Sequence, residues 1–225
     1  MVNAQTWLDQ NYPANSACIR VEDKENYGKT RDKIVNLDIS QQNLESSLYL
    51  NISFSNLKKL NCSFNSLIKI SLDFLQNLEE IDQSHNQIVG GDLQIPSFFN
   101  IKKLNFSYNQ ISGFALNIPS LTYLDATSNS LKMLDLHNSP NLIELKCSNN
   151  PIFNLSLTQS SNLVLFDCLG VRFDKNAMAP TPTSFPSSAS TSLFPTMTIY
   201  INNSTFLGST IGLGVYSGIS TLCCS

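Results

Sequence analysis

Apolar and polar residues alternate in a pattern that recurs from residue 34 to about residue 175. Each copy follows the template L-x-x-L-x-L-x-x-N-x-L, in which the apolar positions point inward and the residues between them point outward. Seven copies fit this template, beginning at Ile34, Leu57, Leu78, Ile101, Leu121, Leu142 and Leu163. Repeats of 20 to 23 residues predict stacked coils, each adding one short parallel strand to a shared sheet.

The asparagine of the template occupies five of the seven copies, as Asn65, Asn86, Asn109, Asn129 and Asn150. The first copy has Gln42 at this position and the seventh has Val171, as expected for the ends of a finite solenoid. Because an amide both donates and accepts hydrogen bonds, stacked asparagines can pair turn backbone groups that would otherwise be buried alone. A second apolar cluster follows each asparagine and predicts extended or 3₁₀ structure.

The two best copies run from Leu57 to Leu67 and from Leu142 to Ile152, and they make the chain resemble leucine-rich-repeat, or L-domain-like, proteins. The resemblance implies an α/β solenoid: a horseshoe with a parallel concave sheet of about seven strands, a mostly non-helical convex side and a short N-terminal helical cap. The opening from Asn3 to Pro13 and the stretch from Asn26 to Arg31 also resemble a fungal L-domain-like group. In that group a Ser/Thr-rich segment and a membrane span often follow the repeats.

Four regions are expected along the chain: an N-terminal cap (1–33), seven repeats (34–175), a Ser/Thr/Pro-rich linker (176–198) and an uncharged Gly/Ser-rich tail (199–225). Asn3 can cap a short helix that carries Trp7 and Leu8. We expect the apolar side of this cap, with Tyr12 and Ile19, to cover the first coil. Residues 197–201 alternate and predict a further strand.

Composition narrows the class of protein. The chain of 225 residues holds 30 Leu and 26 Asn, and its 14 Lys+Arg against 17 Asp+Glu give a net charge of −3, too mild to indicate a nucleic-acid partner. The first residues include no basic region followed by an apolar one, so a secretory signal is not predicted and we expect a cytoplasmic protein. Residues 205–224 leave two interpretations open, a weak membrane segment or a low-complexity tail. The first makes the protein membrane-associated.

Candidate chemistry is sparse. Cys62, Cys147 and Cys168 take inward positions, where small buried hydrophobes are expected, and Gln83 takes the same inward position. His85 and His137 do not lie at metal-ligand spacing from other ligands. With no Ser-His-Asp grouping or phosphate-binding glycine loop in the sequence, we expect no enzyme, no cofactor and no metal site.

The outward positions of the predicted sheet form three columns, the third of them made of Ser and Thr, flanked by an aromatic stripe. We expect the following residues to bind a partner on the concave face: Lys59, Asn61, Phe64, Glu80, Asp82, His85, Lys103, Asn105, Tyr108, Tyr123, Asp125 and Lys146. Exposed aromatics beside charges are enriched in partner-binding surfaces. The alternation of Lys and Glu on neighbouring strands has another interpretation, that these charges neutralise each other.

The sequence thus predicts a non-enzymatic, monomeric module that binds a protein or peptide on its concave face, in signalling or recognition. Phe64, His85, Tyr108 and Tyr123 are the expected anchors. The alternative is a membrane-attached, receptor-like surface protein whose C-terminal tail is the anchor. If the chain were exposed outside the cell, glycans on Asn61 and Asn105 would lie on the concave face.

Overall fold

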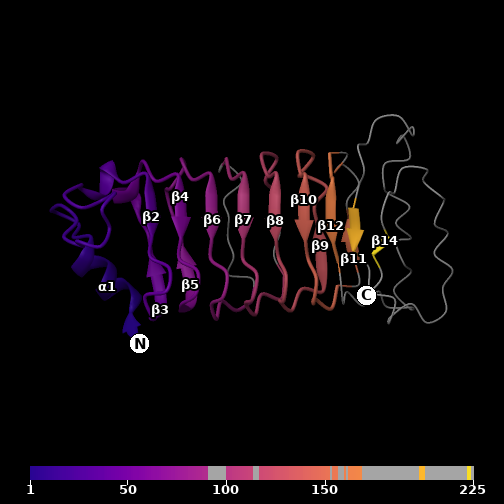
Figure 1. The fold of residues 1–225 in the computed structure, drawn as a ribbon, viewed down its shortest axis with the longest axis horizontal. Coiled ribbons are helices and arrows are strands. Elements are labelled where there is room, and N and C mark those ends of the chain that lie inside the picture. The colour runs from indigo at the N-terminus through magenta and orange to yellow at the C-terminus, as the bar shows by residue number, and fades with distance from the viewer. Residues whose placement is uncertain are drawn as a thin grey trace.

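The chain winds as a parallel β-solenoid whose coils follow one another along the long axis of the molecule (Figure 1). The computed structural model describes residues 1–90, 100–113, 117–152, 154–156, 160, 162–168, 198–200 and 222–223. Nine parallel strands form its main sheet. In spatial order they are β2 (Asn36–Asp38), β4 (Lys59–Asn61), β6 (Glu80–Asp82), β7 (Lys103–Asn105), β8 (Tyr123–Asp125), β10 (Glu144–Lys146), β12 (Leu165–Asp167), β13 (Thr198–Tyr200) and β14 (Leu222–Cys223). The first seven confirm the predicted sheet, and β13 confirms the strand expected over residues 197–201.

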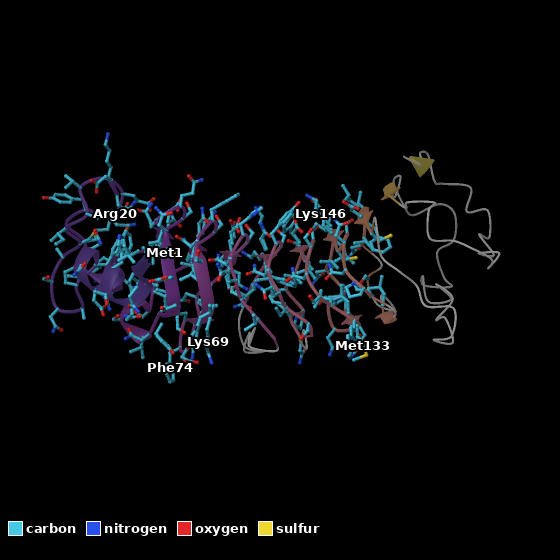
Figure 2. All side chains as sticks on the ribbon, turned by 90° about the horizontal axis from the view of Figure 1, so that it is seen from below. Met1, Arg20, Lys69, Phe74, Met133 and Lys146 are labelled. Atoms are coloured by element: carbon cyan, nitrogen blue, oxygen red, sulfur yellow. The ribbon has the colours of Figure 1, made fainter. Side chains whose placement is uncertain are left out.

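A second layer of extended chain lies on the other side of the solenoid. It contains a sheet of β1 (Val2–Asn3), β3 (Leu44–Tyr49) and β5 (Ser66–Ser71), and a pair of β9 (Met133–Asp135) and β11 (Asn154–Ser156). Figure 2 shows Lys146 of the main sheet on one side of the molecule, with Lys69, Phe74 and Met133 on the opposite side. The prediction of a mostly non-helical second side is confirmed for the described residues, where the only helical elements are α1 (Ala4–Asn11) and two 3₁₀ turns (Arg31–Lys33 and Ile52–Phe54).

Each of the seven repeat strands, from β2 to β12 in the main sheet, is three residues long and buries its central side chain. Leu60, Ile81 and Leu104 illustrate the pattern, being 2%, 3% and 0% exposed. Full burial of such a side chain contributes about 1.5–3 kcal/mol, and no single coil can achieve it alone. Stacking therefore creates one continuous core, which runs from Ala4 to Cys168.

The template asparagines link consecutive coils, as predicted. The Nδ2 of Asn109 donates to the carbonyls of Gln83, Phe106 and Ser107, at 3.0, 3.0 and 3.2 Å. Its Oδ1 accepts the Ile88 N–H at 3.0 Å. Equivalent bonds are made by Asn65, Asn86, Asn129 and Asn150. These bonds pair turn backbone groups of each coil with the next.

The N-terminal helix packs against the first coil. Asn3 caps α1 by accepting the Thr6 N–H at 3.0 Å, and Leu8 and Tyr12 are buried. Arg31, 4% exposed, donates to the Tyr12 carbonyl at 2.6 Å and pairs with Asp9 at 2.5 Å. The prediction that Ile19 shares in covering the coil is wrong.

Ile19 is 61% exposed, and the neighbouring Cys18 is buried in its place. The outer edge of β2 is covered by polar side chains. Arg20 donates to the Asp38 carbonyl at 3.1 Å and Asn26 donates to the Asn36 carbonyl at 2.7 Å. Occupying edge carbonyls in this way opposes pairing with another chain.

Several expectations lie outside the described residues: Val171 in the seventh copy, most of the linker over 176–198, and most of the tail over 199–225. The interpretation of residues 205–224 as a membrane segment therefore stays a prediction. Within the described ranges, no helix combines the length and apolar character needed to cross a bilayer.

Candidate partner-binding face

The outward side of the nine-stranded sheet, here called the sheet face, carries the predicted site residues in rows. The strand register places Lys59, Glu80, Lys103, Tyr123 and Glu144 side by side, and this set is here called the lysine–glutamate row. Two residues further along each strand, Asp38, Asn61, Asp82, Asn105 and Asp125 form a second set, here called the Asx row. An open hollow of about 780 Å³ extends over both rows.

The charges of the lysine–glutamate row pair with one another. The Oε1 of Glu80 lies 3.1 Å from Lys59 Nζ and 3.7 Å from Lys103 Nζ. Beside this row, Glu79 bridges Lys58 and Lys102 at 3.3 and 2.6 Å, and hydrogen bonds from these two lysines lower its carboxyl pKa. Such solvent-exposed ion pairs stabilise a fold very little. The geometry supports the interpretation that these charges neutralise one another.

The Asx row closes a turn at the end of each strand. The Oδ1 atoms of Asn61, Asp82 and Asn105 each accept both the backbone N–H and the hydroxyl of the serine two residues later, at 2.7–3.2 Å. Those serines are Ser63, Ser84 and Ser107, and they are buried. The prediction of an outward serine column is therefore wrong at these positions, because each hydroxyl bends back onto the Asx side chain.

Three carboxylates remain in the Asx row, on alternate strands. Asn61 Nδ2 donates to Asp38 Oδ2 at 3.3 Å, and Asn105 Nδ2 donates to Asp82 Oδ2 at 3.2 Å. Across the described part of the chain, Asp38, Asp82 and Asp125 make no ion pair. Lys146 is the cross-strand neighbour of Asp125, and Arg20 bonds the backbone carbonyl of Asp38, whereas Asp82 has an asparagine on each neighbouring strand.

The predicted aromatic stripe is a stack of three rings, here called the aromatic ladder. Phe64 and His85 have ring centroids 4.1 Å apart with planes at 12°, and His85 and Tyr108 are 4.2 Å apart at 9°. Phe64 and Tyr108 are 51% and 50% exposed. The ladder follows the Asx row by three residues on each coil, which limits their separation to about 11 Å.

The ladder residues have left-handed backbone conformations, with φ of 53°, 51° and 55°. Gln41, Ser128 and Asn149 adopt the same φ at the equivalent turn of other coils, so the turn itself imposes this conformation. Glycine or asparagine would occupy it more easily than a bulky aromatic residue. The turn therefore does not explain the aromatic side chains.

Tyr123 is not part of the ladder, although the sequence grouped it with the other anchors. It begins β8, whereas the ladder residues follow the ends of their strands. Lys146 Nζ lies 5.4 Å from the centre of the Tyr123 ring and 3.0 Å from Glu144. Burial, followed by the charge of Asp125, raises the phenol pKa.

A second asparagine column escaped the sequence analysis. Asn56, Asn77, Asn141 and Asn162 donate from Nδ2 to backbone carbonyls of the preceding coil, at 2.7, 2.8, 2.8 and 3.1 Å. Each directly precedes the first leucine of a repeat, and that recurring pair is the signal in the sequence. The column joins coils at an exposed corner and does not contribute to the sheet face.

The inward cysteines Cys62, Cys147 and Cys168 are buried. Burial raises the pKa of Cys168 to about 12 and also raises those of Cys62 and Cys147. Gln83 is buried, and its Nε2 has no hydrogen-bond partner among the described residues, which leaves the cost of burying this polar atom uncompensated there. Among the described residues, no group of three His, Cys, Asp or Glu side chains could hold a metal ion.

Comparisons with known proteins concern the fold alone. No protein-family model and no curated protein matches the sequence. The structure is similar to the functional domain of InlJ from Listeria monocytogenes, at 21% identity and a TM-score of 0.42, over 60% of this chain and 39% of that one. It is also similar to YopM from Yersinia enterocolitica, at 24% identity and a TM-score of 0.45, over 62% of this chain and 34% of that one.

This chain therefore spans well under half the length of either matched protein. Neither protein is fungal, so the resemblance of the opening to a fungal group stays a prediction. The chain is a parallel β-solenoid with seven repeat strands in its main sheet and a short N-terminal helix.

Proposed function

We propose that the protein is a non-enzymatic interaction module that holds a protein or peptide against the sheet face. The aromatic ladder is the observation that supports this proposal most strongly. The left-handed backbone conformation at this turn is strained for aromatic residues. Their half-exposed side chains also bury less apolar surface than they would in the core. Aromatic residues are the commonest anchors of protein interfaces, where a partner completes their burial.

The remaining face residues have a different role in the proposal. The lysine–glutamate row is already paired, so its members orient a partner and add little binding energy. Phe64, His85 and Tyr108 are the anchors, and Tyr123 is a separate contact about 7 Å further from the ladder than the Asx row. The proposal assigns no reaction to the chain, since His85 is stacked between two rings and His137 pairs with Asp135 beside the opposite layer.

A pull-down that compares two double variants tests the proposal. The first is Phe64→Ala/Tyr108→Ala, which removes the outer rings of the ladder. The matched control is Tyr49→Ala/Phe74→Ala, which removes two exposed aromatics from the other layer; Phe74 is 65% exposed and also has a positive φ, of 70°. We expect partners recovered by the wild type to be lost with the first variant and kept with the control. Equal recovery by all three proteins, or loss only with the control, contradicts the proposal.

A further inference from the structure

The carboxylates of the Asx row are evenly spaced along the solenoid. Asp38, Asp82 and Asp125 lie on β2, β6 and β8, with one strand between each pair. Neighbouring strands are about 4.8 Å apart, so the carboxylates repeat every ~9.6 Å along the long axis seen in Figure 1. The intervening positions are the neutral residues Asn61 and Asn105.

This spacing selects among peptide conformations. A polyproline II helix rises about 3.1 Å per residue with three residues per turn, so every third side chain lies on one side at intervals of ~9.3 Å. A β-strand repeats on one side at about 6.7 Å. On an α-helix, side chains three or four residues apart lie near one side at about 4.5–6 Å, and those seven residues apart at about 10.5 Å. The polyproline II repeat is the one that stays in register with all three carboxylates.

The aromatic ladder favours the same conformation independently of charge. Peptides in the polyproline II conformation dock on aromatic-lined surfaces because they are already extended and lose little entropy on binding. Phe64, His85 and Tyr108 border the Asx row over β4, β6 and β7, between Asp38 and Asp125. A peptide lying along the row therefore contacts the ladder with its remaining side chains.

The two ends of the row limit what binds. Lys146 lies on β10 between Asp125 and Asp167, so a peptide that extended beyond Asp125 would cross a positive charge before it reached the next carboxylate, on β12. The chain's own linker over 176–198 has four prolines but no Lys or Arg, and no charged residue follows Lys175. The occupant that matches the row is therefore another molecule.

We propose that the sheet face binds a basic polyproline II peptide, with Lys or Arg at every third residue, that lies along the solenoid from Asp38 to Asp125. This inference rests on the proposed function and names the chemistry of its partner. Each cation meets one carboxylate of the Asx row, and the residues between them pack against the aromatic ladder.

Two peptides of identical composition test whether the spacing of the cations matches that of the carboxylates in the Asx row. In Arg-Pro-Pro-Arg-Pro-Pro-Arg the cations are three residues apart, and in Arg-Arg-Arg-Pro-Pro-Pro-Pro they are adjacent. Fluorescence anisotropy of labelled peptides with the full chain at low ionic strength measures both affinities. We expect the spaced peptide to bind about fivefold more tightly, because exposed ion pairs each contribute a factor of about 1.4 to 5.

Two protein variants of equal net charge distinguish the match in spacing between arginines and carboxylates from nonspecific attraction of a basic peptide to the protein. Asp38→Asn/Asp82→Asn/Asp125→Asn should abolish the preference, and its turns should survive because Asn61 and Asn105 already form the same turn. The control, Glu45→Gln/Asp73→Asn/Asp135→Asn, removes three charges from the opposite layer and should keep the preference. Equal binding of the two peptides to the wild type, or loss of the preference in the control, overturns the inference. The peptide preference can be absent while the Phe64→Ala/Tyr108→Ala variant still loses its partners in the pull-down. In that case the proposed interaction module is retained and only the assignment of a basic peptide is wrong.

Discussion

Replacing Asn109 by alanine should destabilise the solenoid far more than replacing an exposed asparagine that also bonds to the preceding coil. Asn109 is buried and makes four hydrogen bonds to two coils. Its three acceptor carbonyls each keep a second donor: Gln83 O is bonded by Asn86, Phe106 O by Asn129, and Ser107 O by the His85 N–H. In the described structure, the Ile88 N–H has no acceptor other than Asn109 Oδ1.

The magnitude follows from this count. An orphaned buried N–H costs about 1–3 kcal/mol, and three further bonds to carbonyls that keep partners add roughly 0.5 kcal/mol each. We therefore expect Asn109→Ala to lower the free energy of unfolding by about 3 kcal/mol. Asn141→Ala is the matched control, since Asn141 is exposed and makes one bond, of 2.8 Å, to the Pro119 carbonyl. It should cost less than about 1 kcal/mol.

Urea denaturation followed by circular dichroism measures both values. The slope with urea has to be compared as well as the midpoint, because a solenoid can lose cooperativity when one coil is weakened. A common slope with a much lower midpoint for Asn109→Ala is the expected result. Equal midpoints for the two variants would refute the assignment of the template asparagine as the link between coils.

Further predictions concern the two ends of the chain and its core. Deleting residues 1–30 should expose Leu37 and Ile39 of the first coil, which are now buried, and cause aggregation. Deleting residues 205–225 should leave a soluble, cooperatively melting protein. Solubility and thermal melts decide both predictions. Carbonate extraction should leave the full chain in the soluble fraction, and retention in the membrane pellet would favour the receptor-like alternative. The Cys168 thiol should resist alkylation until the protein unfolds, as peptide mass spectrometry can show. Because its folded pKa is raised from 9.0 to about 12, the stability tied to this proton is intact below pH 9 and falls as pH rises to 12.

The repeat made much of the fold predictable. Each strand and each template asparagine occurs in an environment that neighbouring coils reproduce, so a position such as Asn109 could be assigned from its spacing alone. The same logic placed Phe64, His85 and Tyr108 in one column, and strands about 4.8 Å apart bring rings in one column close enough to stack.

Other features lay beyond the alternation of apolar and polar residues. Ser84 is buried because its hydroxyl bonds to Asp82, a local interaction that competes with the outward direction given by strand periodicity. The exposure of Ile19 depends on the irregular path between α1 and β2, which has no repeat to guide a prediction. The pairing of Glu80 with two lysines was one of two open interpretations, since sequence spacing does not give side-chain distances.

Site-specific photo-cross-linking tests the central claim, that the sheet face holds the partner, most directly. A photoreactive residue at position 103 samples the sheet face, and one at position 69 samples the opposite layer (Figure 2). Both lysines are exposed, so a photoreactive residue at either position is accessible to solvent. The account predicts that specific adducts form at position 103 and not at position 69, and that Phe64→Ala/Tyr108→Ala abolishes them. Adducts at position 69 alone, or adducts at position 103 that persist without the ladder, would contradict it.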